Sequence, residues 1–293
     1  MTDRLADHLS ALIGERHRIS TPGALQRAEE YLVQQFRNLG LPVAAHAFDA
    51  EGTTYRNVVA TLPSSSQVPQ STSHQAGMQG PLVIAAHYDT VLGSPGADDN
   101  ASGLAVMLEV ARRLVDLSLQ RAVRLIGFCL EEEDLLGSLA YASHLRATGQ
   151  AVGGAIVLEC VGYARSEDGS QLAPPGVPIA VPTRGDFLGI VGNTASAELV
   201  ASFESAANRH VADLKTVSLV VPGNGEVLPD TRRSDHAAFW HYGYPAVMLT
   251  DTANFRNPHY HQPTDTLETL HLGFMQQVTD AVSAAAIELA NRC

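Results

Sequence analysis

Residues 82–89 read Leu-Val-Ile-Ala-Ala-His-Tyr-Asp, a short apolar run that ends in a histidine and an aspartate. Three further short apolar runs follow along the chain, at residues 123–130, 155–158 and 246–249. Segments with apolar residues at helical spacing, such as 104–117 and 274–289, alternate with these runs. Strands that are apolar throughout are typical of a sheet covered by helices on both faces. The pattern predicts a single-domain three-layer α/β/α sandwich with a mixed, largely parallel central sheet.

The N-terminal part of the chain has a different pattern of expected elements. Pro22 follows Thr21, and apolar residues then recur at helical spacing until Gly40, which predicts a helix. Strands are expected at 43–48 and 55–62, and a loop rich in Ser, Gln and Gly at 63–80. No linker or internal repeat divides the chain. We therefore expect one domain over residues 1–293, with N-terminal helices in about 1–40 and a core in about 81–270.

Composition excludes several classes of protein. The chain carries 31 acidic and 19 basic residues, a formal net charge of -12. A surface of that sign repels nucleic acid and anionic membrane, so neither is an expected partner. The three cysteines are too few and too scattered for a disulfide framework or a thiolate zinc site. The first 14 residues lack the apolar stretch of a signal peptide, which favours a cytoplasmic location; a secreted protein whose leader had been removed would look the same.

Ionisable residues follow three of the apolar runs at once. His87 and Asp89 follow the first run, acidic residues 131–133 the second, and Glu159 the third. In open α/β sheets, ligands bind outside the carboxyl ends of the strands, so we expect these groups to converge. Residues two apart lie on the same side of an extended chain, and Asp89 can accept a hydrogen bond from one imidazole nitrogen of His87 while the other binds metal.

Two acidic clusters exceed what ordinary helix capping needs. Asp98 and Asp99 lie in a polar turn that opens a predicted helix, where one capping residue would suffice. A carboxylate can instead bridge two divalent cations roughly 3.5–4 Å apart. Glu131 to Asp134 are four consecutive acids, which favour either the first turn of a helix or a bound cation that offsets their repulsion.

Two further clusters contain histidine. His259 and His261 flank Tyr260 in a proline-rich loop, and we expect only one of these histidines to bind an ion. Ser234-Asp235-His236 has the composition of a hydrolytic triad, but adjacent residues cannot take up triad geometry with one another. We interpret this segment as a hydrogen-bonding turn at the edge of a pocket.

Five motifs occur in a fixed order: His87-x-Asp89, Asp99-Asn100-x-Ser102-Gly103, Glu131-Glu132-x-x-Leu135-Leu136-Gly137-Ser138, Glu159-x-x-Gly162 and Tyr260-His261-x-x-x-Asp265-Thr266. Together they resemble the co-catalytic di-zinc exopeptidases of clan MH, which include leucyl-type aminopeptidases, glutamate carboxypeptidase and glutaminyl cyclases. The similar region runs from about residue 82 to 270. The resemblance implies that residues 1–293 form a single zinc-dependent peptidase domain whose metal-binding core is about 81–270. Any single motif is weak evidence, but their order makes a chance match improbable.

The resemblance implies a role for each motif residue. Two Zn²⁺ ions per chain are implied, bridged by Asp99 and by a water or hydroxide. Glu131 is implied as the general base that takes the proton of that water, and Tyr260 as a donor to the oxyanion. A cis peptide bond is implied after Asp99. The implied metal ligands are His87 and Glu159 for one ion, Glu132 and His261 for the other, and Asp99 for both.

The expected function is hydrolysis of an N-terminal peptide bond. The nearest alternative is a carboxypeptidase or an amidohydrolase acting on N-acylated amino acids, which Arg256 would favour if it clamped a substrate carboxylate. A glutaminyl cyclase-like transferase and a non-catalytic receptor-like protein are further alternatives. Both are less favoured, because all five ligand positions are occupied by suitable residues and Glu131 is present. The substrate is expected to be a peptide or small amide held by walls from residues 162–185 and 222–233. Side-chain preference, the metal in the cell and the oligomeric state are not readable from the sequence.

Overall fold

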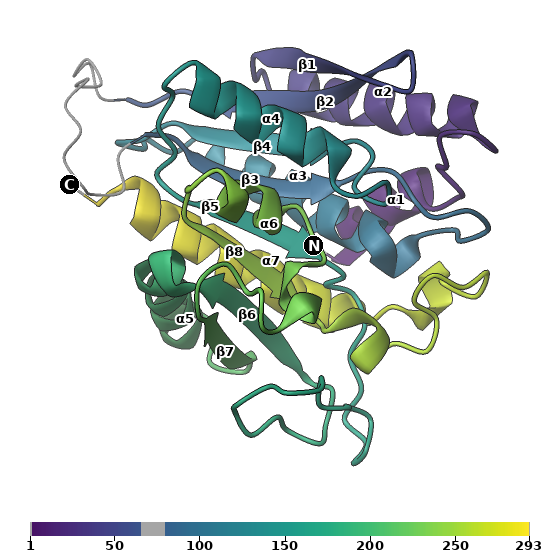
Figure 1. Ribbon diagram of the computed structural model, residues 1–293, viewed down its shortest axis with the longest axis vertical. Helices are drawn as coiled ribbons and strands as arrows, with labels where there is room; N and C mark the ends of the chain where they lie inside the picture. The colour runs from purple at the N-terminus through teal and green to yellow at the C-terminus, as the bar shows by residue number, and fades with distance from the viewer. Residues whose placement is uncertain (1, 66–79, 293) are drawn as a thin grey trace.

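A computed structural model describes residues 2–65 and 80–292, which form an eight-stranded sheet between two layers of helices. Residues 66–79 of the expected loop at 63–80 lie outside the described part of the chain. Figure 1 shows the sheet running through the whole molecule, with helices before and behind it. This architecture confirms the predicted α/β/α sandwich.

The sheet is mixed, with parallel pairs at the centre and a further parallel pair, β6 and β7, at one edge. The order is β1-β2-β4-β3-β5-β8-β6-β7, in which β3 pairs in parallel with β4 and β5, and β5 pairs in parallel with β8. The pairs β1/β2, β2/β4 and β6/β8 are antiparallel. The strands are β1 (Val43–Ala50), β2 (Thr53–Leu62), β3 (Leu82–His87), β4 (Val123–Phe128), β5 (Ala155–Glu159), β6 (Phe187–Asn193), β7 (Lys215–Val221) and β8 (Ala246–Thr250).

The helices divide between the two faces of the sheet. On one face lie α1 (Thr2–Leu12), α2 (Pro22–Asn38), α3 (Gly103–Leu114), α5 (Ala197–His210) and α7 (Leu272–Ala290), which share one apolar core. On the other face lie α4 (Leu136–Ala147) and α6 (His236–His241), which pack on a second core and face the viewer in Figure 1. Among the described residues, no helix combines the length and apolar character that crossing a bilayer would need.

The expected helix after Pro22 and the expected strands at 43–48 and 55–62 are present, but the edge beyond β8 was not foreseen. The β6 strand contains two glycines and ends in asparagine, and β7 is an edge strand whose side chains are only partly buried. Neither strand therefore has the continuous apolar run of a central strand. The apolar run at 123–130 is longer than β4, which ends at Phe128. Two residues later, Leu130 has a φ of 60°, and the chain leaves the sheet there.

Leu32 tests how firmly α2 is fixed to the sheet that carries the site. Its side chain is buried in the first core, so we expect Leu32→Ala to lower the free energy of unfolding by about 2–5 kcal/mol. The matched control is Gln34→Ala on the exposed face of the same helix, which we expect to change stability by less than about 0.5 kcal/mol. Urea unfolding followed by circular dichroism measures both; equal effects of the two variants would contradict this packing.

Candidate active site

The ends of two neighbouring parallel strands form the base of the site. His87 is the last residue of β3 and Glu159 the last residue of β5. His87 Nε2 lies 3.5 Å from Glu159 Oε2 and 3.1 Å from Oδ1 of Asp99, which comes from the turn η1 (Ala97–Ser102) between β3 and α3. The structure thus places the ionisable residues together at the carboxyl ends of the strands, as the sequence predicts.

Asp99 lies between two histidines. Its second oxygen, Oδ2, is 2.9 Å from His261 Nε2, which in turn is 3.3 Å from Glu132 Oε2. One carboxylate therefore separates a pair formed by His87 and Glu159 from a pair formed by His261 and Glu132. This is the grouping that the motifs imply, in which Asp99 is the shared residue.

Several buried polar atoms in this cluster have no hydrogen-bond partner among the described residues. Leaving such atoms unpaired is costly, so their gathering at one place indicates a ligand. Their chemistry, imidazole nitrogen and carboxylate oxygen, suits a divalent metal ion. The described residues include groups able to hold one, among them His87 with Asp99 and Glu132. The unpaired atoms are His87 Nδ1 and Nε2, Asp99 Oδ1, Glu132 Oε1 and His261 Nε2.

Glu131 follows β4 and is buried beside the cluster. Its Oε2 is 3.9 Å from His87 Nε2. Burial raises the pKa of Glu131 well above its usual range, and burial together with the charge of Asp99 raises the pKa of Glu132 to about 7. A raised pKa makes a carboxylate a stronger proton acceptor, which is a property that a general base needs.

Asp89 makes a different contact from the one expected. Its Oδ1 is 3.6 Å from His87 Nδ1, which is too long for a hydrogen bond. Instead, the backbone amides of Glu131 and Glu132 donate to Oδ1 and Oδ2 of Asp89, each at 3.1 Å. The predicted direct hydrogen bond to the imidazole is therefore corrected: Asp89 holds the acidic turn in place, because two well-placed amides occupy its oxygens.

The backbone that carries Asp99 is fixed from several directions. The amides of Asp98 and Asp99 donate to the carboxylate of Asp265 at 3.0–3.2 Å, and the Asn100 side-chain amide donates to the carbonyl of Leu158 at 2.8 Å. The peptide bond between Asp99 and Asn100 is cis, as the resemblance implied. Asp265 and Asn100 thus have supporting roles that motif spacing alone did not reveal.

The Ser234-Asp235-His236 segment is a hydrogen-bonding turn, as interpreted from the sequence. Ser234 Oγ donates to Glu159 Oε2 at 2.7 Å, and His236 Nε2 lies 2.8 Å from the carbonyl oxygen of Thr231. Ser234 therefore orients one of the strand-end carboxylates. Sequence reasoning placed the turn near the pocket but did not find this contact, because the two residues are 75 positions apart.

The two histidines of the proline-rich loop separate as expected. His259 Nδ1 lies 2.9 Å from Thr264 Oγ1 and points away from the cluster, whereas His261 joins it. The Tyr260 ring stacks on the His261 ring with centroids 3.8 Å apart. Arg233 Nη2 donates to the Tyr260 hydroxyl oxygen at 3.2 Å, so that the hydroxyl proton is free to point elsewhere.

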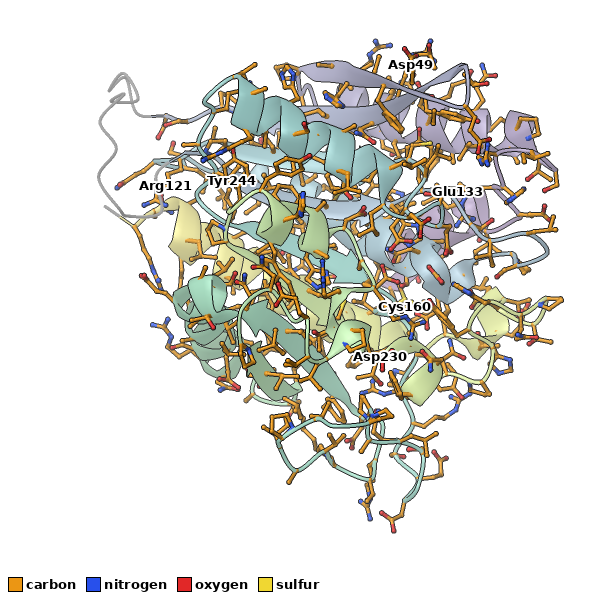
Figure 2. The ribbon with its side chains drawn as sticks, in the orientation of Figure 1. Asp49, Arg121, Glu133, Cys160, Asp230 and Tyr244 are labelled. Carbon is orange, nitrogen blue, oxygen red and sulfur yellow. The ribbon has the colours of Figure 1, made fainter. Side chains whose placement is uncertain are left out.

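An apolar pocket opens beside Glu159 and Tyr260. It lies over β6, β7 and β8 on the face where α4 covers β1 and β2 and α6 covers β5 and β8. No α-helix in the described part of the chain covers it: residues of 174–181 and 228–233, within the two expected ranges, line its other sides together with residues 252–255 and Tyr260, which lie outside those ranges. Figure 2 labels Asp230 at this pocket and Cys160 at the neighbouring end of β5. The apolar lining includes Val177, Ile179, Val181, Val217, Leu219, Leu228 and Met248.

Arg256 does not line this pocket, and its expected role is corrected. The side chain is buried, with its Nε donating to Gln171 Oε1 at 2.8 Å and its Nη1 donating to the carbonyl of Tyr163 at 3.3 Å. Its guanidinium also packs over the Phe187 ring, 4.5 Å from the ring centroid. These contacts bind the 163–185 loop to the body of the protein and engage Nε and Nη1, whereas Nη2 has no hydrogen-bond partner among the described residues.

A model of peptidase family M28 matches residues 57–286. The chain belongs to this family. It is 35% identical over 273 residues to the uncharacterized protein YfbL of Escherichia coli, covering 88% of this chain and 78% of the relative. The LapA aminopeptidase of Legionella pneumophila shares the fold, with a TM-score of 0.74, 20% identity and coverage of 100% of this chain and 72% of that one.

A second solved structure is nearer in sequence. BSAP, a zinc aminopeptidase from Bacillus subtilis, is 26% identical, with a TM-score of 0.60 and coverage of 83% of this chain and 52% of that one. The chain spans about half the length of the curated aminopeptidases that it matches, 55% and 54% for two of them. The family match confirms the resemblance to clan MH and the expected enzyme class, a metallo-exopeptidase.

Arg256→Lys tests the corrected role of this arginine. Lysine cannot keep both hydrogen bonds and the packing on Phe187, so we expect the free energy of unfolding to fall by about 1–3 kcal/mol. The ratio of rates on substrates with and without a free carboxylate is expected to stay constant. Chemical denaturation and paired kinetic assays measure the two effects. A variant of normal stability that loses only the carboxylate-bearing substrates would restore the original assignment.

Proposed function

We propose that this protein is a zinc-dependent aminopeptidase that removes an apolar residue from the N-terminus of a peptide. The observation that carries the proposal is the position of Asp99 between His87 and His261, with a further carboxylate beside each histidine. Membership of family M28 and the likeness to a zinc aminopeptidase support zinc as the metal.

The donor set supports two ions rather than one. His87 and Glu159 would hold the first ion, Glu132 and His261 the second, and Asp99 would contribute one oxygen to each. Imidazole and carboxylate ligands, few enough to leave positions open, are those of catalytic zinc sites. When bound, zinc supplies Lewis acidity that lowers the pKa of a water molecule from 15.7 toward about 7.

Glu131 is the residue proposed to move the proton. It is buried beside His87 and does not belong to either pair around Asp99, so its carboxylate is free to act as a base. It would take a proton from the attacking water and deliver it to the leaving amine. Asp89, by holding the amide of Glu131, fixes the start of this side chain.

Tyr260 is proposed to stabilise the negative charge that develops on the carbonyl oxygen. Its ring is held by stacking on His261, and its hydroxyl oxygen already accepts a hydrogen bond from Arg233. Burial raises the pKa of Tyr260, so the hydroxyl keeps its proton and can donate it in a hydrogen bond.

The pocket supports a preference for large apolar side chains. It encloses about 110 Å³ lined mainly by aliphatic residues, and it opens next to Glu159 at the metal cluster. A side chain entering it would leave water for an apolar surface, which is favourable at about 25 cal/mol per Å² buried. A charged side chain would lose its hydration there without a partner deep in the pocket.

One observation favours a second candidate function. Arg233, rather than Arg256, is the arginine that lines the pocket, close to Tyr260 and Asp230. A carboxylate at the pocket mouth would find a bidentate partner there, as a carboxypeptidase or an amidohydrolase needs. The aminopeptidase is preferred because Arg233 is already engaged by Asp230, Asn254 and Tyr260.

Glu131→Gln tests the proposed base. The amide keeps the shape of the side chain but cannot accept the proton, so we expect turnover to fall by at least about 100-fold while the zinc content stays at the wild-type level. Asp134→Asn, an exposed position in the same turn, is the matched control and should keep full activity. Steady-state kinetics and elemental analysis of the same preparations decide; near wild-type turnover of Glu131→Gln would remove it from the mechanism.

A panel of small substrates tests the direction of cleavage and the pocket together. We expect leucyl 4-nitroanilide to be hydrolysed roughly 100-fold faster than glutamyl 4-nitroanilide, and N-acetyl-leucyl 4-nitroanilide to be inert. N-acetyl-leucine serves as the substrate for the alternative. If the acylated compounds were cleaved and the free-amine compounds were not, the amidohydrolase would replace the aminopeptidase.

A further inference from the structure

The segment between α1 and α2 contacts both loops that carry acidic residues of the site. Residues 14–18 read Gly-Glu-Arg-His-Arg. The amide of Gly14 donates to the carbonyl of Pro95 at 2.9 Å, so the segment lies against the 88–96 loop. The motifs gave this segment no function, and neither Arg16 nor Arg18 belongs to the proposed catalytic machinery.

Arg16 is buried beneath the 88–96 loop. Its amide donates to Thr90 Oγ1 at 2.9 Å, and its Nε donates to the carbonyl of Tyr88 at 2.8 Å. The rest of the guanidinium donates to carbonyls at the far end of the same loop, Pro95 at 3.2 Å and Gly96 at 3.1 Å. One side chain therefore ties the residue after His87 to the residues that precede Asp99.

Arg18 binds the other loop. Its Nε lies 2.9 Å from Glu133 Oε1 and its Nη2 donates to Oε2 at 3.1 Å, a two-pronged ion pair in which only the Nη2 contact is a hydrogen bond. Its Nη1 donates to Glu51 Oε2 at 2.8 Å. The Arg18 side chain is 12% exposed and that of Glu133 30%, which makes this pair better shielded than an ordinary surface ion pair. Figure 2 shows Glu133 on the side where the purple N-terminal part of the chain passes.

Glu133 follows Glu131 and Glu132 directly, and three adjacent acids repel one another. Asp89 fixes the backbone of the first two, whereas the third is neutralised by Arg18. The chain then turns through Asp134 and Leu135, both with positive φ, and the amides of Leu135 and Leu136 donate to the carbonyls of Glu131 and Leu130 at 2.9 and 3.0 Å. Arg18 thus supplies both charge balance and a fixed anchor to this turn.

We infer that Arg16 and Arg18 form an N-terminal clamp that sets the position of the Asp99 loop and the Glu132 turn relative to each other, and that Arg18 is a positioning residue for Glu132. The inference rests on the proposed function, because it concerns the metal affinity of the site. The clamp explains why residues 14–18, which precede every strand of the sheet, contact both loops of the site. These residues contribute no side chain to the cluster itself.

Arg18→Gln and Glu133→Gln test the clamp by removing the ion pair from either side. For each variant, we expect the dissociation constant for zinc to rise roughly 10-fold, the effect of losing a residue that supports a metal ligand. The double variant should be no worse than either single one, because both remove the same interaction. Arg18→Lys, which keeps the charge without the two-pronged geometry, should lie between. Competition with a chromophoric chelator measures zinc affinity. At saturating zinc, we expect the kcat of each variant to return close to the wild-type value.

The matched control is Arg113→Gln. Arg113 is 18% exposed and lies 2.7 Å from Asp280, in an ion pair that joins α3 to α7. This variant should lose comparable thermal stability but keep wild-type zinc affinity. Zinc affinity of Arg18→Gln and Glu133→Gln within twofold of wild type, or an equal loss in Arg113→Gln, would overturn the clamp. A wild-type protein that binds no zinc would instead overturn the proposed function and the clamp with it.

Discussion

The carboxylate of Asp99 lies between two imidazoles, and most of the surrounding structure serves to keep it there. A buried carboxylate is expensive unless hydrogen bonds and opposite charges surround it. Asp99 has the two histidines in front and a backbone held by Asp265 and Asn100 behind. The central parallel strands make this possible, because His87 and the neighbouring Glu159 end their strands at the same edge of the sheet.

The acids behind the cluster are satisfied by the protein itself, which distinguishes them from Asp99 and Glu132. Asp98 accepts from the Gly162 amide and the Asn257 side chain, and Asp251 accepts from the amides of Tyr163 and Ala253. These carboxylates have structural partners and need no ion. Unpaired atoms lie instead on four side chains of the cluster, His87, Asp99, Glu132 and His261, and on the neighbouring carboxylate of Asp235. This contrast, rather than the number of acids, is what points to a metal at one place and not at the other.

Much of this arrangement could be predicted from the sequence, for a physical reason. Central strands buried on both faces must be apolar throughout, so β3, β5 and β8 stand out, and ionisable residues at their ends are equally visible. The strands β6 and β7 lack that signal because they are glycine-containing or half-exposed. Arg256 was misjudged, and Arg18 passed over, because the partner of an arginine is chosen by tertiary structure: Gln171 and Glu133 lie 85 and 115 positions away in the chain.

The unforeseen edge of the sheet is also where the proposed substrate pocket lies. Helices cover the rest of that face, but over β6 and β7 only loops do, and an uncovered apolar sheet surface can receive a side chain from outside. The metal cluster and the pocket thus come from different parts of one sheet, meeting at Glu159 and Tyr260. Residues of the 162–185 and 222–233 loops can therefore alter the side chain accepted without moving His87 or Asp99.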